Sequence, residues 1–331
     1  MAGRRRKKSG GRSYAWRYRG RIVACVFVEV IIICALVIMI GWNKGVKEWF
    51  EQFEQPVLKE VDISGINSPN AILMQARGGK ILGEINGEAQ IYPASMTKIM
   101  TVILGIENFD DLDEKITLTN EMFTGLYEQD ATQAGFQPGE EVRVIDLLYG
   151  AMLPSGAECC IALADTISGS EADFAELMNK KARKLGMENT HFCDSTGLHN
   201  PDHYSTVKDI AVLMKYCIKN DTFREIVETS RHSTGVTNIH PDGITYYSTM
   251  FKNLSDPTVT GGKILGGKTG YTSEAGHCLV SFAEIEGREY IFVSAGASGA
   301  DGNTIPHIQD AVTVYNRVGA AIDAKMNNNN K

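Results

Sequence analysis

Two residues in this chain have the types and the spacing for nucleophilic catalysis. Ser95 and Lys98 lie three positions apart in the stretch Tyr-Pro-Ala-Ser-Met-Thr-Lys, so a helix places both side chains on one face, one turn apart. A serine hydroxyl is a weak nucleophile until a base removes its proton. A lysine can be that base when burial or nearby positive charge lowers its pKa. The pair is therefore a candidate nucleophile and general base.

The surrounding segment predicts the helix that this geometry requires. Pro93 has a φ preset near the helical value and lacks the N–H that a first turn leaves unpaired, so it suits a helix start. Residues 96–106 are mostly apolar, with no helix breaker before Gly105. We expect a buried helix that opens at Pro93 and directs its positive end toward charge developing at Ser95.

The same spacing occurs again at Ser205 and Lys208, where a structural interpretation is favoured. Ser205 follows a turn-rich stretch and precedes an apolar periodic run at 207–218, so we expect it to cap the N-terminus of a helix. Spacing alone does not decide between a catalytic and a structural role for Ser95. The decision depends on motifs elsewhere in the chain.

Charge divides the 331 residues into unequal parts. The formal net charge is −7, and nine Lys and Arg with no acidic residue in residues 1–21 leave −16 on the remainder. An acidic body argues against a nucleic-acid partner. The content of 43% hydrophobic and 22% charged residues is ordinary for a folded globular protein.

The basic arm precedes a segment long enough to cross a membrane. Residues 22–41 are apolar apart from Glu29 and Gly41, and a run of this length spans a bilayer as a helix. The positive flank predicts a single-pass protein of the cell membrane with a cytoplasmic N-terminus. No small-residue cleavage site follows the run, which favours an uncleaved anchor over a removed signal peptide.

The expected domain organisation follows from these boundaries. It comprises a basic cytoplasmic arm, a transmembrane anchor, a polar stalk, a folded extracytoplasmic domain and a disordered tail, at residues 1–21, 22–42, 43–68, 69–322 and 323–331. The seven cysteines have neither a disulfide framework nor metal-ligand spacing. His199 and His203 flank Pro201, which breaks any helix that presents them together. We therefore expect neither a metal nor a cofactor.

Periodicity within the body predicts strands at both ends and helices between them. A hairpin around Gly78-Gly79 is expected from residues 71–75 and 80–85. Three consecutive antiparallel strands are expected at 261–271, 278–285 and 290–295, and helices at 158–167, 173–185, 207–218 and 309–324. This order indicates an α+β (mixed) domain with an antiparallel sheet covered by helices.

Lys268-Thr269-Gly270 is the second feature suited to chemistry. These residues are expected on a strand at or near the sheet edge, where free backbone groups can pair with an extended peptide. Gly270 leaves room for a close approach, while Lys268 and Thr269 suit a terminal carboxylate. Taken alone, the motif is better explained as a glycine-rich turn with a solvated lysine.

Three motifs therefore follow one another, namely Ser95-x-x-Lys98, Ser155-Gly156-Ala157 and Lys268-Thr269-Gly270. Their order resembles that of the penicillin-interacting serine enzymes, which carry Ser-x-x-Lys, Ser-x-Asn and Lys-Thr-Gly. The flanking sequence is similar to the low-molecular-mass serine D-alanyl-D-alanine carboxypeptidases, a penicillin-binding protein family, over residues 70–320. The similarity is carried by residues 93–98, 147–164, 189–198, 203–206 and 267–272.

The resemblance implies a fold and roles for the site residues. The fold is the penicillin-binding transpeptidase or β-lactamase-like domain, a five-stranded antiparallel sheet flanked by helices, with a helical subdomain. Ser95 forms an acyl-enzyme with the terminal D-Ala-D-Ala of a peptidoglycan stem, Lys98 is the general base, and Ser155 relays the proton to the leaving amine. The substrate-binding residues that the resemblance implies are Lys268, Thr269, Gly270, Tyr271 and Lys252. β-Lactam antibiotics are implied as acylating inhibitors.

The chain departs from the family pattern in three ways. Ala157 stands where Ser-x-Asn has asparagine. The expected anchor is N-terminal, where many relatives have a C-terminal amphipathic helix, and their β-rich second domain is expected to be absent.

Three other functions remain open from the sequence. A β-lactamase-type hydrolase needs an additional positioned carboxylate, for which Glu158 is nearby in sequence. An inactive, membrane-anchored penicillin receptor is consistent with Ala157. A zinc peptidase is a remote alternative.

Overall fold

A computed structural model describes residues 30, 58–254, 256–299 and 305–329. The predicted basic arm and, apart from Val30, the predicted anchor lie outside these residues. Among the residues that the structure describes, no helix is long and apolar enough to cross a membrane.

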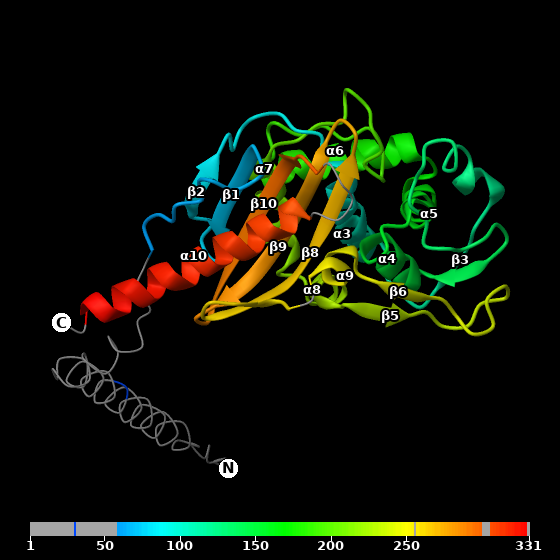
Figure 1. Ribbon diagram of the computed structural model, residues 1–331. Coiled ribbons are helices and arrows are strands. Elements are labelled where there is room, and N and C mark those ends of the chain that lie inside the picture. Colours follow the sequence, from blue (N-terminus) through cyan, green and yellow to red (C-terminus); the bar gives the residue numbers. More distant parts are fainter. Residues whose placement is uncertain (1–29, 31–57, 255, 300–304, 330–331) are drawn as a thin grey trace, which may run out of the picture. The chain divides into compact units, whose positions relative to one another are not determined.

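The domain is built on one antiparallel sheet (Figure 1). In spatial order its strands are β2 (Ile81–Ile85), β1 (Asn70–Gln75), β10 (Arg288–Ala297), β9 (Gly276–Ile285), β8 (Gly262–Thr272) and β7 (Thr258–Val259). The expectation of five strands is corrected to six, because Gly261, with φ 76°, turns the chain so that β7 pairs with the start of β8. Beyond Lys263, this edge of β8 has no partner strand among the residues that the structure describes.

Side chains alternate between the two faces of the sheet and form two cores. One face packs against α10 (Pro306–Asn329), with Leu73, Phe292 and Tyr315 in its core. The other face packs against the helical part of the domain, with Ile72 and Val293 in its core. The sheet is therefore covered by helices on both faces, as the sequence predicts.

The helical part surrounds α3 (Lys98–Asn108), which is buried from Lys98 to Gly105. A helix that is apolar on all sides is stable only in such an interior position. The helices around it are α4 (Val144–Met152), α5 (Ala157–Ser168), α6 (Glu171–Leu185), α7 (Val207–Cys217) and α8 (Asp221–Glu228). The smaller elements are η1 (Ala94–Thr97), η2 (Asn120–Phe123), α9 (Thr249–Asn253), and the hairpins β3 (Lys115–Thr117) with β4 (Glu141–Arg143) and β5 (Arg231–Ser233) with β6 (Thr245–Tyr247).

Most predicted elements are confirmed, and two helix starts are corrected. The N-terminal hairpin forms as β1 and β2, and the three C-terminal strands form as β8, β9 and β10. Pro93 opens the 3₁₀ helix η1, and the α-helix begins only at Lys98. The cap of α7 is Thr206 and not Ser205, because the Thr206 hydroxyl accepts from the N–H of Asp209.

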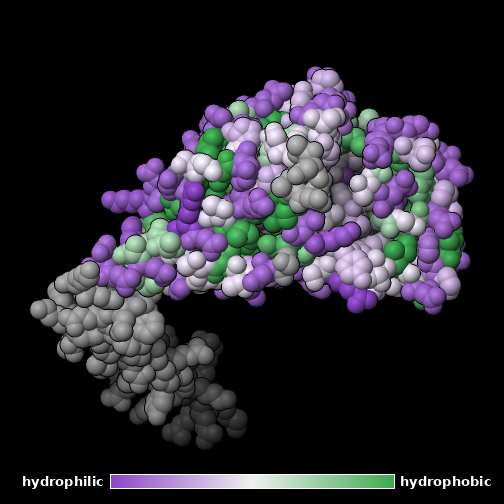
Figure 2. Space-filling view, in the orientation of Figure 1, coloured by the Kyte–Doolittle hydropathy of each residue, from purple (hydrophilic) through white to green (hydrophobic). Residues whose placement is uncertain are grey.

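The packed body differs at both ends from the expected boundaries. Leu58, Val61 and Ile63 are buried in the core under α10, although residues 43–68 are expected to form a stalk. At the other end, α10 continues to Asn329, into the expected tail. The surface seen in Figure 2 is mainly hydrophilic, with hydrophobic residues scattered in small groups.

Candidate active site

The predicted nucleophile and base are in contact. Nζ of Lys98 lies 2.9 Å from Oγ of Ser95 and donates to the carbonyl oxygen of Thr196 at 2.6 Å. Lys98 is 3% exposed, and this burial lowers its pKa below the ordinary lysine value. A neutral amine that donates to Thr196 keeps a lone pair for the hydroxyl proton of Ser95. The geometry therefore suits general-base activation of the serine.

The edge of β8 lies directly against the turn that carries Ser95. A side chain at Gly270 would place its Cβ 3.0 Å from the backbone nitrogen of Ser95, so only glycine allows this approach without displacement. Ala94, just before the nucleophile, has φ 47°. Such a conformation is uncommon for a residue with a side chain and is concentrated at functional sites.

A second serine–lysine pair lies on the other side of the site. Nζ of Lys268 donates to Oγ of Ser155 at 2.9 Å and to the carbonyl oxygen of Thr269 at 3.0 Å. Lys268 is 1% exposed; burial, followed by the charge of Lys98, places its pKa well below the ordinary value. Ser155, like Ala94, has a positive φ, 74°. The structure thus brings four predicted residues into two hydrogen-bonded pairs.

Both serines open into one cleft of about 690 Å³. Thr269, Gly270 and Tyr271 line it from the free edge of β8, and the Thr269 hydroxyl lies 2.7 Å from that of Thr249 on α9. Tyr271 is 61% exposed. An edge strand flanked by hydroxyl groups is suited to an extended peptide with a polar end.

Lys252 and the second Ser-x-x-Lys pair do not join this cleft. Lys252 is exposed on α9 and does not line the cleft. Two other residues of α9, Thr249 and Asn253, do line it. Oγ of Ser205 instead lies 2.8 Å from the Thr190 hydroxyl, and Lys208 pairs with Glu88.

Ala157 is buried at the start of α5, and its N–H donates to the carbonyl oxygen of Thr132 at 2.8 Å.

Glu158, the next residue, accepts from the N–H groups of Ala134 and Gly135 at 2.6 and 2.9 Å through Oε1. Burial raises the Glu158 pKa. Glu158 does not line the cleft; it binds the end of the segment 129–135, whose residues Gln129, Asp130 and Thr132 line one wall.

The loop that holds Lys98 is organised by Asp194. One carboxylate oxygen accepts from the N–H groups of Thr196 and Gly197 at 2.7 and 2.6 Å, and the other lies 3.1 Å from Nδ1 of His203. Burial opposes ionisation, but the His203 hydrogen bond and charge outweigh it and lower the Asp194 pKa to about 2. This loop presents the Thr196 carbonyl to Lys98.

Sequence reasoning missed these positioning residues. Asp194, Thr196 and Gly197 form an Asx-type turn, and the Asp-Ser-Thr-Gly run is a local signal for such a turn. Nothing in the sequence indicates that the Thr196 carbonyl faces Lys98, because these two residues are 98 positions apart.

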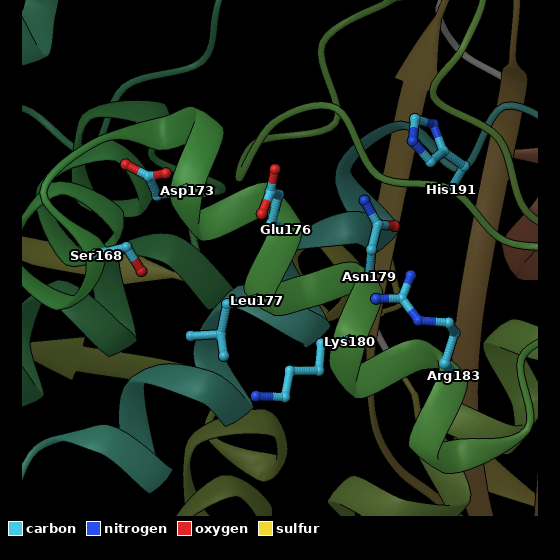
Figure 3. A pocket seen from close by; sticks show the side chains of 8 residues that line it. All are labelled: Ser168, Asp173, Glu176, Leu177, Asn179, Lys180, Arg183 and His191. Atoms are coloured by element: carbon cyan, nitrogen blue, oxygen red, sulfur yellow. The ribbon is translucent and has the colours of Figure 1, made fainter.

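A second hollow, of about 720 Å³, lies along α6 (Figure 3). It shares no lining residue with the cleft and contains none of the predicted site residues. Its lining side chains are Ser168, Asp173, Glu176, Leu177, Asn179, Lys180, Arg183 and His191. We therefore assign the chemistry to the cleft.

The fold and the site together define a class, that of serine acyl-transfer domains in which a lysine three residues after the nucleophile is the base. A comparison with family models then identifies the family. The chain belongs to the D-alanyl-D-alanine carboxypeptidase family Peptidase_S11, whose model matches residues 57–299. The resemblance inferred from the three motifs is confirmed.

Individual relatives agree with this assignment. The chain is 35% identical over 233 residues to D-alanyl-D-alanine carboxypeptidase DacF of Bacillus subtilis, covering 69% of this chain and 57% of the relative. It is 35% identical over 236 residues to a D-alanyl-D-alanine carboxypeptidase of Streptomyces sp. strain K15, covering 69% and 78%. The matches to the first three curated relatives span 57–60% of their length.

Solved structures show the same fold. The DD-transpeptidase of Streptomyces K15 superposes with a TM-score of 0.69 at 29% identity, covering 79% of this chain and all of that one. A D-alanyl-D-alanine carboxypeptidase of Mycobacterium tuberculosis has a TM-score of 0.69 at 22% identity, which supports the fold alone. The predicted mixed penicillin-binding-type fold is confirmed.

Proposed function

We propose that this protein is a serine D-Ala-D-Ala carboxypeptidase that removes the terminal D-alanine from peptidoglycan stem peptides. The observation that carries the proposal is the 2.9 Å contact between the buried Lys98 amine and the Ser95 hydroxyl. Family membership supports the substrate class. β-Lactams, as acylating analogues of the same peptide end, are the expected inhibitors.

Acylation begins with proton transfer from Ser95 to Lys98. The Ser95 oxygen attacks the carbonyl carbon of the D-Ala-D-Ala bond, and negative charge develops on the carbonyl oxygen. The N–H groups of Ser95 and Tyr271 are the proposed donors to that oxygen, and each such donor is worth about 10²–10³ in rate. The proximity of Gly270 to the Ser95 nitrogen supports this pairing.

The second serine–lysine pair serves the leaving group. Ser155 passes the proton from Lys98 to the departing D-alanine nitrogen as the carbon–nitrogen bond breaks. Lys268 holds the Ser155 hydroxyl in place and contributes positive charge near the terminal carboxylate, with Thr269 as a hydroxyl donor. Water then attacks the acyl-enzyme, which releases the shortened stem peptide and restores Ser95.

The experiment is D-alanine release from a D-Ala-D-Ala-ended pentapeptide by the domain, with fluorescent penicillin labelling in parallel. Wild type and Ser205→Ala should release D-alanine and take the label, and Ser95→Ala should do neither. Labelling of Ser95→Ala at the wild-type level would exclude Ser95 as the nucleophile.

Two alternatives are separated by the same preparations. A β-lactamase turns over nitrocefin rapidly; Glu158, the carboxylate suggested for that role, instead binds backbone N–H groups outside the cleft. An inactive receptor takes the penicillin label but releases no D-alanine.

We also propose that residues 22–41 anchor the protein in the cell membrane with the domain outside the cytoplasm. The support is the length of the apolar run and the positive charge before it. Protease added to intact protoplasts should remove the domain and leave the anchor. A protected domain, or a mature N-terminus near residue 42, would contradict this topology.

A further inference from the structure

His307 has an unsatisfied nitrogen at the cleft wall. It lies in the first turn of α10, is 5% exposed and lines the same cleft as Ser95. Its Nδ1 is buried and has no hydrogen-bond partner among the described residues. Buried polar atoms are nearly always paired in native proteins. Nδ1 of His307 is therefore a polar atom at this wall whose hydrogen bond the described residues leave unmade.

The His307 ring is held in place by a stack of rings. It stacks on His277 of β9, with ring centroids 5.0 Å apart and planes at 5°, and His277 in turn contacts Tyr271 at 4.7 Å. Burial lowers the pKa of His277. Burial, followed by the charge of His277, also lowers the pKa of His307 to about 4, although the charge of Asp310 acts in the opposite direction. A lowered pKa favours the neutral imidazole, which carries one N–H donor and one acceptor nitrogen.

Among the described residues, the cleft lining includes no exposed lysine or arginine that could bind a carboxylate. No lysine or arginine lines it within the described part of the chain, and Asp130 and Glu274 line it instead. Lys268 is buried behind Ser155. A carboxylate in this cleft therefore meets neutral donors, with Lys268 buried behind Ser155.

Strand geometry identifies the wall on which those donors lie. Lys268 and Gly270 face Ser155 and Ser95, and side chains alternate along a strand. Thr269 and Tyr271 therefore face the other side of the sheet, toward α10. A peptide lying along the free edge of β8 presents its groups alternately to the two sides.

We propose that His307 is a substrate-binding residue whose Nδ1–H donates to the terminal carboxylate, alongside the hydroxyls of Thr269 and Thr249. The inference rests on the proposed function and adds a neutral carboxylate-binding group that the three motifs do not contain. The preference of the enzyme for substrates with a free terminal carboxylate then depends on imidazole and hydroxyl donors and not on an exposed cation.

The test compares acylation by benzylpenicillin with acylation by its methyl ester, which lacks the charged carboxylate. His307→Phe keeps a ring against His277 but removes the donor, so acylation by the free acid should fall about tenfold or more, as for loss of a hydrogen bond to a charged group. Acylation by the ester should change less than twofold. His307→Asn, which offers an amide donor near the position of Nδ1, should retain most of the preference for the acid.

His191→Phe, the same substitution in the hollow along α6, is the matched control and should not alter the preference. Thermal melting of each variant separates loss of a donor from loss of fold. Equal slowing of acid and ester in folded His307→Phe would overturn the proposal. If Lys252→Ala lost the preference for the free acid and His307→Phe kept it, the proposal would be wrong, and the exposed lysine would be the carboxylate-binding residue. Failure of the proposed carboxypeptidase activity is measured separately, as acylation without D-alanine release.

Discussion

At the scale of single residues, the site depends on two buried lysines in different roles. Lys98 contacts the nucleophile, whereas Lys268 contacts Ser155 and the backbone of Thr269. Burying an amine disfavours its charged form, which helps a base but weakens a carboxylate-binding charge. The two lysines should therefore respond differently to substitution.

The pH dependence of acylation tests the role of Lys98. The neutral amine is the active form, and burial lowers its pKa, so the acylation rate should rise with pH through a midpoint below the ordinary lysine range. Lys98→Met removes the base and Lys98→Arg stays protonated, so both should lose acylation by about 10²-fold or more. Stopped-flow acylation by nitrocefin across pH gives the profile. An unchanged rate in Lys98→Met would refute the assignment.

Ser155 and Ala157 provide a second comparison at this scale. Ser155 is hydrogen-bonded to Lys268, while Ala157 is buried with its N–H satisfied by Thr132. We expect Ser155→Ala to reduce D-alanine release much more than Ala157→Asn changes it, the asparagine contact being worth about 1–3 kcal/mol. Steady-state D-alanine release measures both. If the wild type released no D-alanine and Ala157→Asn restored release, the chain would instead be an inactive relative.

At the scale of elements, the sequence predicts those helices and strands that local patterns of residues determine. The strands β8, β9 and β10 and the helices α5, α6 and α7 are predicted because periodicity and turn residues are local signals. Three features escaped prediction: β7, whose two residues are too short for a pattern, the stack from Tyr271 to His307, and the contact from Thr196 to Lys98. The last two join residues distant in sequence, which periodicity does not report.

Substitution of Glu158 tests how the segment 129–135, which lines one wall of the cleft, is held in place. Glu158→Ala leaves the N–H groups of Ala134 and Gly135 without their acceptor, so we expect a loss of about 1–3 kcal/mol in unfolding free energy and slower acylation. Glu158→Gln keeps an acceptor oxygen and removes the charge. Urea unfolding and nitrocefin acylation measure the two effects.

The raised pKa of Glu158 adds a pH dependence to the same comparison. A carboxyl group with a pKa raised in the folded state stabilises the fold below its unfolded pKa, and this stabilisation is lost as pH rises through the folded pKa. The unfolding free energy of wild type should therefore fall relative to that of Glu158→Gln as pH rises above about 4.5. A constant difference between the two proteins from pH 4.5 to 8 would argue against a raised pKa.

At the scale of the whole molecule, the two cores place the site between two supports. The helical core fixes Ser95 and Lys98, and the core under α10 fixes the other side of the sheet and the wall that carries His307. Residues 58–68 belong to the second support. Leu58, Val61 and Ile63 are buried there, and Asn67 and Ser68 donate to the buried carboxylate of Asp310 at 2.6–2.9 Å.

A comparison of two fragments tests whether those residues are a stalk or part of the fold. Fragment 69–331 lacks three buried apolar side chains, each worth about 1.5–3 kcal/mol, and leaves the Asp310 carboxylate without these four hydrogen bonds. We therefore expect its unfolding free energy to be several kcal/mol below that of fragment 57–331. Fragment 57–331 should match the full chain in penicillin acylation, because Ser95, Lys98 and both cores are intact. Equal urea midpoints for the two fragments would show that residues 57–68 are only a tether, and the domain would then begin where the sequence placed it, at residue 69.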